Sequence, residues 1–155
     1  MIYKKTDMKN WIRFPILIFL FIVMIISVNI TGEEAARKRD KVLNNNVSFK
    51  GYVVDYRVSN NHRFGIIQLK LTESSVNIFN DSLQSGIYPY KILGDVAEVY
   101  TTISGDLDYY DTISVKSKSK EIIYEQTKSH PKYISELNVI EGSGDIKYVK
   151  KKTLF

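Results

Sequence analysis

The stretch VSFKGYVVDYRV, residues 47–58, decides the fold. It is rich in β-branched and aromatic residues, which are enriched in strands. Gly51 stands in its middle, where we expect a β-bulge or a sharp bend of the kind found in barrel strands. The stretch RFGIIQLKL, residues 63–71, follows after a short polar turn, so the two stretches together predict a β-hairpin.

Further strands are expected towards the C-terminus. They are VAEVYTTI (96–103), DTISVKS (111–117) and EIIYE (121–125). The segment between the hairpin and these strands is looser, and Val76, Phe79 and Leu83 at helical spacing predict at most a short helix there. Residues 127–150 fit either a hairpin or a helical turn followed by a strand. Five to seven short strands with few helices predict a mainly β domain over 46–155, either a small OB-like barrel or a β-sandwich.

The N-terminal part has the composition of a membrane anchor. A basic segment, residues 1–13, precedes an apolar run from Phe14 to Ile30 that contains no ionisable side chain. At about 1.5 Å per residue this run makes a helix of roughly 26 Å, close to the roughly 30 Å hydrocarbon core of a bilayer. We therefore expect a transmembrane helix over 14–30, with Trp11 as an interfacial anchor and Arg13 extending to the headgroups.

Two other interpretations of the apolar run fit less well. A cleaved signal peptide has an apolar region of roughly 7 to 15 residues and small residues before its cleavage site, whereas this run is longer and SVNITGEEAA offers no such pair. A soluble core helix is rarely apolar on every face. Residues 31–45 then form a charged juxtamembrane helix and linker. A short basic N-terminus followed by an apolar run resembles an export signal, so we place the C-terminal domain outside the cytoplasm.

Charge and composition limit the partners and the chemistry. Residues 1–45 contain eight Lys and Arg against four Asp and Glu, and residues 46–155 contain fourteen against thirteen, which gives +4 and +1 of the total +5. Because the β domain is almost neutral, we do not expect it to bind nucleic acid. Cysteine is absent, which excludes disulfides and thiolate nucleophiles.

No catalytic, cofactor or metal site is predicted. His62 and His130 are the only histidines, and both stand in expected loops. Asp106, Asp108 and Asp111 match half of a calcium loop, but Ser117 occupies the position where such a loop has its last glutamate. We therefore assign no enzymatic activity and no cofactor.

Two groups of residues are candidates for surface roles. Tyr88, Tyr90, Tyr109 and Tyr110 lie in predicted loops, and exposed tyrosines are favoured in protein contacts, although tyrosine is also common in β proteins for packing alone.

The second group is the lysine row Lys116, Lys118 and Lys120, whose alternate positions put all three on one face of a strand. A nucleic-acid groove would need interleaved aromatic residues, which this run lacks. Lysines at such a strand end discourage edge-to-edge pairing, so we interpret them as an edge guard.

Gly51 in a long first strand, the hairpin to FGIIQLKL and the three later strands resemble an OB-type five-stranded barrel. Over residues 12–125 the chain is also similar to uncharacterised small single-pass bacterial membrane proteins, in which an N-terminal helix carries such a domain. Tyr110-Asp111 stands where that pattern has Gly-Asp. The resemblance implies a fold and a membrane location, and no activity.

We therefore expect a single-pass membrane protein whose non-enzymatic β domain binds another protein of the cell envelope. The lipid bilayer is its other partner, through the N-terminal helix. One alternative is an OB-type single-stranded nucleic-acid binder on the cytoplasmic side, which would need a basic groove lined by aromatic residues. The other is a secreted carbohydrate-binding domain that is released by signal cleavage.

Overall fold

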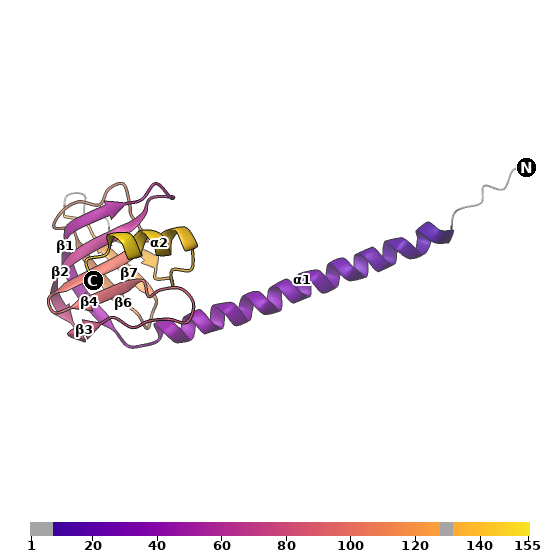
Figure 1. Cartoon of the computed structure of the whole chain (residues 1–155), viewed down its shortest axis with the longest axis horizontal. Helices are drawn as coiled ribbons and strands as arrows, with labels where there is room; N and C mark the ends of the chain where they lie inside the picture. The colour runs from indigo at the N-terminus through magenta and orange to yellow at the C-terminus, as the bar shows by residue number, and fades with distance from the viewer. Residues whose placement is uncertain (1–7, 128–131) are drawn as a thin grey trace, which may run out of the picture. The chain divides into compact units, whose positions relative to one another are not determined.

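The computed structural model describes the backbone of residues 8–127 and 132–155 and, within these ranges, the side chains from Phe14 onwards except that of Ala35. The chain divides into two compact units, Met1–Lys38 and Arg39–Phe155. The helix α1 (Met8–Leu43) begins in the first unit and ends in the second, and the second unit contains all the strands (Figure 1).

The apolar run of α1 confirms the prediction of an N-terminal apolar helix. Every side chain from Phe14 to Ile30 is exposed, and α1 is long and apolar enough to cross a membrane. The side chains of Trp11 and Arg13 lie outside the described residues, so their anchoring roles remain predictions. The helix continues through the charged segment to Leu43, as expected, and Arg37 pairs with Glu33 one turn away.

The second unit contains one antiparallel sheet. Its strands are β1 (Ser48–Val58), β2 (Phe64–Ser74), β3 (Ile78–Phe79), β4 (Tyr90–Leu93), β5 (Val96–Thr102), β6 (Thr112–Lys116), β7 (Glu121–Glu125) and β8 (Lys132–Glu136). The order is β3-β4-β5-β2-β1-β6-β7-β8, and within residues 8–127 and 132–155 no pair joins β3 to β8. The mainly β prediction is therefore confirmed, with the strands in a single sheet that does not close into a barrel.

The predicted hairpin and its bulge are present. β1 pairs with β2 along most of its length, and the register shifts between Lys50 and Gly51. A Cβ atom on Gly51 would lie 2.5 Å from the backbone oxygen of Lys70, which explains why glycine occupies the bulge. The first half of β1 also pairs with β6, so β1 is the central strand of the sheet.

The core lies on one face of a strongly curved sheet. Tyr124 of β7 lies within hydrogen-bonding reach of Thr101 of β5, although three strands separate β5 from β7 in the sheet. A flat sheet would hold these strands roughly 19 Å apart at the usual spacing of about 4.8 Å, so the sheet must bend around the core. Leu43, the last residue of α1, is fully buried in the main cluster of core side chains.

The helix α2 (Ser143–Lys152) covers part of the opposite face of the sheet (Figure 1). Its Val149 packs with Phe64, Ile66 and Tyr100 of β2 and β5 in a second buried cluster. Glu98 of β5 is fully buried beneath it. The Glu98 carboxylate accepts hydrogen bonds from three groups, which are Thr153 Oγ1 at 2.6 Å, Tyr100 Oη at 3.0 Å and the Leu154 amide at 3.0 Å. These bonds fix the C-terminal end of α2 on the sheet.

Two expectations about local structure are wrong. Residues 76–83 form no helix, because Val76, Phe79 and Leu83 pack on the core from an irregular chain and the two-residue strand β3. The segment 127–150 is neither a hairpin nor a helical turn followed by a strand, because β8 comes first and α2 follows. The glycines at 142 and 144 suggested a turn, but burial of Val149 against the sheet stabilises a helix there.

Candidate interaction surface

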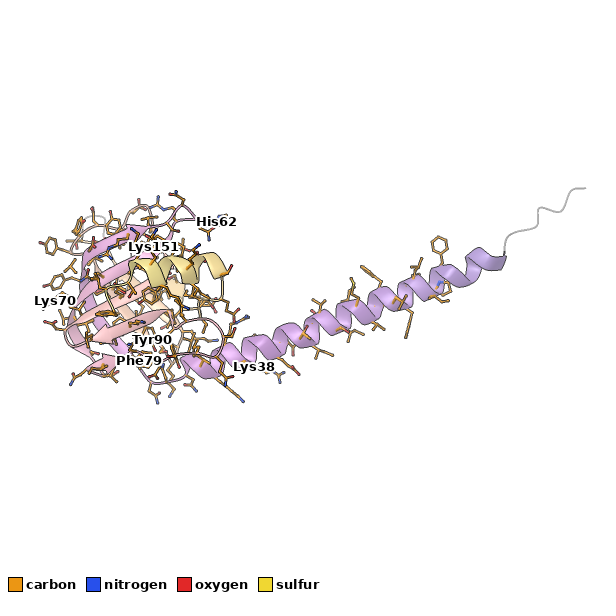
Figure 2. All side chains as sticks on the ribbon, viewed as in Figure 1. Lys38, His62, Lys70, Phe79, Tyr90 and Lys151 are labelled. Carbon is orange, nitrogen blue, oxygen red and sulfur yellow. The ribbon has the colours of Figure 1, made fainter. Side chains whose placement is uncertain are left out.

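The sequence predicted Tyr90 in a loop. The structure places it instead in β4, where its side chain is fully buried. Its ring centre lies 4.9 Å from that of Phe79 and 5.4 Å from that of Phe49. Figure 2 labels Tyr90 and Phe79 in the β domain. The Tyr90 hydroxyl donates to Ser117 Oγ at 3.0 Å and hydrogen-bonds with the Asn45 amide group, and burial raises the pKa of the phenol. This location excludes Tyr90 from a surface contact.

Tyr88 is half-buried and packs edge-on against Phe79, with the ring centres 4.9 Å apart. Burial raises the pKa of its phenol as well. Its ring therefore belongs to the edge of the core rather than to an exposed loop.

Tyr109 and Tyr110 are the two predicted contact residues that the structure leaves at the surface. Their exposed fractions are 54% and 70%. Each ring lies next to a tyrosine of β1: Tyr109 is 5.7 Å from Tyr56, and Tyr110 is stacked 6.0 Å from Tyr52. We call these four residues the tyrosine surface.

The loop that carries Tyr109 and Tyr110 is fixed to β1 by backbone hydrogen bonds. The Tyr110 amide donates to the Val53 carbonyl at 2.9 Å, and the Val53 amide donates to the Asp111 carbonyl at 2.9 Å. Tyr110 has a φ of 70°, in the left-handed region that tyrosine seldom adopts. Such a conformation persists where the surrounding structure determines it, which indicates a loop held in one shape.

Asp111 provides the second support of this loop. Its side chain is 2% exposed, and its carboxylate accepts the amide of Thr127 at 2.8 Å and that of Asp108 at 2.9 Å. The acid that resembled a calcium ligand in the sequence thus joins two backbone segments. Within the part of the chain that the structure describes, no group of three or more His, Asp or Glu side chains is placed to hold a metal ion.

The lysine row does not lie at a sheet edge, so the edge-guard interpretation is wrong in its geometry. β6 ends at Lys116 and pairs with β1 on one side and β7 on the other, whereas the edges of the sheet are β3 and β8. Lys118 and Lys120 belong to the turn between β6 and β7, and Lys120 has a φ of 56°. Ile113 and Val115, which alternate with the outward residues of β6, are both fully buried.

Ser117 explains why the strand stops where it does. Its hydroxyl is fully buried and donates to the carbonyl of Leu43 at the end of α1. In the sequence, this serine stands only at the last position of the incomplete calcium-loop pattern. It is instead a hydrogen-bonding link between the β6–β7 turn, α1 and Tyr90.

The two histidines of the chain were both expected in loops. His62 is exposed in the β1–β2 turn with a φ of 46°, and His130 lies outside the described residues. Tyr52, Tyr56 and the supporting role of Asp111 were not predicted, because their contacts form only when β1 and the loop before β6 meet in space.

The chain matches no family model, no curated protein and no solved structure. Its function must therefore be argued from its own residues.

Proposed function

We propose that this chain is a single-pass membrane protein whose non-enzymatic β domain binds another protein of the cell envelope through the tyrosine surface. The observation that carries the proposal is the pair Tyr109 and Tyr110, which are highly exposed on a loop whose backbone is hydrogen-bonded to β1. Large aromatic side chains in such an arrangement contribute contact area at a small cost in conformational entropy.

The arrangement favours recognition of a protein over a small molecule. The rings of Tyr109 and Tyr110 are more than half exposed, and each lies against one other tyrosine ring, Tyr56 and Tyr52 respectively. They therefore offer open aromatic area and are not enclosed by neighbouring side chains. Tyrosine is enriched in protein interfaces because its ring is apolar and its hydroxyl can pair with polar groups at the rim.

The length and composition of α1 support the anchor. Its uninterrupted apolar surface from Phe14 to Ile30 has no covering residues within the described structure. The proposed orientation puts the N-terminus in the cytoplasm and the β domain outside it, because the basic segment precedes the apolar run directly.

An OB-like arrangement is part of the proposal. The order β5-β2-β1-β6-β7, with the long bulged strand β1 in its middle, supports it. OB barrels bind oligonucleotides and oligosaccharides on the face of their second and third strands. The corresponding face of β2 and β5 is covered here by α2, which argues against the nucleic-acid and carbohydrate alternatives.

Site-directed photocrosslinking in the native membranes tests the proposed contact. A photoreactive phenylalanine analogue at Tyr110 should give one adduct of defined mass, and the adduct should disappear when Tyr109 is changed to Ala. The same analogue at Leu93, an exposed residue of β4 with an exposed fraction of 54%, serves as the control. Equal adducts at both positions, or none at Tyr110, would refute the proposed surface.

The anchor and the orientation are tested separately. The full-length chain should remain in the membrane pellet after a carbonate wash, and a C-terminal phosphatase reporter should be active. A mature N-terminus between residues 27 and 40 would show signal cleavage and end the anchor proposal. A phosphatase reporter that is inactive while a fluorescent reporter folds would place the domain in the cytoplasm.

A further inference from the structure

The β6–β7 turn lies against the end of α1 within the second unit. Lys120 Nζ is 2.8 Å from the carboxylate of Asp40, and the hydroxyl of Ser117 donates to the carbonyl of Leu43. The residues that follow α1, Asn46 to Ser48, run beside the same turn, since Ser48 is paired with Lys116 and the Ser117 amide donates to Val47. The turn and the start of β1 thus form the end of the domain at which the chain arrives from α1, which we call the proximal end.

Positive charge at the proximal end is not neutralised. Lys41, Lys116 and Lys118 are exposed and form no ion pair among the described residues. Of the nearby acids, Asp40 pairs with Lys120, whereas Glu121, opposite Lys116 in the register, accepts the neutral Ser119 hydroxyl at 2.8 Å and keeps its charge. Lys41, Lys116, Lys118 and Lys120 still outnumber these two carboxylates. The three free ammonium groups therefore remain available to an anionic partner.

Two shallow grooves on either side of Lys116 are lined with hydroxyl groups. The first, of about 440 Å³, is lined by Ser48, Lys50, Ser74, Ser75 and Ser114, with Glu73 as its acid. The second, of about 520 Å³, is lined by Asn46, Ser48, Lys116 and Lys118, together with Ser117 and Ser119. The hydroxyls of Ser117 and Ser119 already donate to Leu43 and Glu121, so Ser48 and the two lysines remain as donors in this groove. Hydroxyl and ammonium groups donate hydrogen bonds to phosphate oxygens. Both grooves therefore match a phosphate-bearing headgroup in chemistry.

The length of the chain limits how far the proximal end can be from the membrane. Ten residues of α1 separate Ile30, the last residue of the apolar run, from Asp40. A helix of ten residues is about 15 Å long. The attraction of a lysine to an anionic leaflet falls off over a Debye length of about 8 Å at physiological salt. The headgroup layer itself takes up about 5 to 7 Å of this length. A membrane anchor thus keeps the proximal end within about one Debye length of the headgroups.

We propose that Lys41, Lys116 and Lys118, with the hydroxyl-lined grooves, bind anionic phospholipid headgroups of the leaflet in which the chain is anchored. This inference rests on the proposed anchor and adds a second contact with the bilayer. β1 runs from Ser48 at the proximal end to Tyr56 and the loop of Tyr109 at the other end of the domain. Headgroup binding therefore leaves the tyrosine surface directed away from the lipid and accessible to a protein partner.

The test uses the full chain reconstituted in vesicles. The absence of cysteine allows a single dye at Asn44→Cys, at the proximal end, or at Asn60→Cys, in the β1–β2 turn; both positions are exposed. Vesicles contain phosphatidylcholine alone or with 30% phosphatidylglycerol, and in both cases a headgroup-labelled lipid that quenches the dye. Because both leaflets contain the same lipids, the measured quenching does not depend on the orientation of the chain in the vesicle membrane.

We expect stronger quenching at residue 44 in the anionic vesicles than in the neutral ones, and no such difference at residue 60. The difference should vanish in high salt and in the variant K41Q/K116Q/K118Q. Removal of one lysine should lower the ratio of docked to undocked domain about fivefold, and removal of all three about a hundredfold, from the contribution of a basic residue at an anionic surface. The control variant K147Q/K150Q/K151Q on α2 removes the same charge and should retain the difference.

Three results would overturn the inference. They are equal quenching at residue 44 in both kinds of vesicle, loss of the difference in the α2 control as well, and a difference that survives in K41Q/K116Q/K118Q. A salt-sensitive complex of the chain in neutral vesicles with a single-stranded oligonucleotide, lost in K41Q/K116Q/K118Q, would assign the lysines to nucleic acid and would also overturn it. Failure of the anchor is distinguished by a carbonate wash of the same vesicles, because every variant retains α1.

Discussion

Replacement of Asp111 by Ala tests whether the tyrosine surface depends on a buried carboxylate. The carboxylate accepts two backbone amides, those of Asp108 and Thr127, from a side chain that is 2% exposed. A hydrogen bond to a charged group contributes about 1.5 to 3 kcal/mol. Both amides are part-buried, so water replaces the lost acceptor in part. We therefore expect Asp111→Ala to lower the free energy of unfolding by about 2 to 4 kcal/mol, a large part of the total for a small domain.

Asp111→Asn is the graded variant, because its amide oxygen can still accept one of the two hydrogen bonds. We expect about half of the loss measured for Asp111→Ala. Asp106→Ala, at an exposed position of the same loop, is the matched control and should change the free energy of unfolding by less than about 0.5 kcal/mol.

The measurement is a urea titration of the full chain in a non-ionic detergent, followed by near-ultraviolet circular dichroism. Ten of the eleven tyrosines lie after residue 45, so this signal reports on the β domain. The crosslink at Tyr110 should weaken in Asp111→Ala under conditions where the domain remains folded. A loss below about 1 kcal/mol for Asp111→Ala, or equal losses for Asp111→Ala and Asp106→Ala, would refute the reasoning.

Three further predictions address the sheet, its ionisation and α2. A Cβ atom on Gly65 would collide with the Arg57 carbonyl oxygen, so Gly65→Ala should lower the free energy of unfolding by more than about 3 kcal/mol. Gly144 lies in open space within α2, so Gly144→Ala should raise the free energy of unfolding by up to about 1 kcal/mol. Urea titration measures both changes. Burial raises the pKa of Tyr124 from 10.0 to about 12, so its phenol ionises only in the unfolded state between these values. The contribution of Tyr124 to the free energy of unfolding should therefore be constant below pH 10 and should fall by about 3 kcal/mol by pH 12. Tyr124→Phe should remove this part of the slope in pH-dependent melting. Glu98→Ala leaves three donors without their acceptor, so amide exchange in α2 should become at least about tenfold faster while that of β6 changes less; equal acceleration in both would contradict a local role.

The sequence by itself determined the elements whose signals are local. The apolar run of α1 is visible because each of its residues is apolar, and β1, β2, β5, β6 and β7 are visible because their alternation and β-branched residues repeat over five or more positions. Gly51 marked the bulge because only glycine tolerates the approach of the Lys70 carbonyl at that position.

Tertiary structure decided what each strand neighbours and which side chains reach the surface. Tyr90 and Tyr110 both stand in turn-rich stretches of the sequence, yet Tyr90 is fully buried and Tyr110 is 70% exposed. The difference arises because pairing with β5 turns Tyr90 towards Phe49 and Phe79, whereas the backbone bonds to Val53 hold Tyr110 outside the sheet.

The lysine row and the C-terminal segment also show that local sequence patterns do not predict long-range contacts. Alternation placed Lys116, Lys118 and Lys120 on a strand, but the buried hydroxyl of Ser117 bonds to the end of α1 and ends β6 at Lys116. α2 has two glycines near its start and little intrinsic preference for a helix, and it forms because Val149 is buried against β2 and β5. The periodicity of apolar residues depends only on near neighbours in the chain, so it can be recognised in the sequence. Contacts between residues far apart in the chain decide the strand order, which tyrosine is buried and where a charged side chain lies.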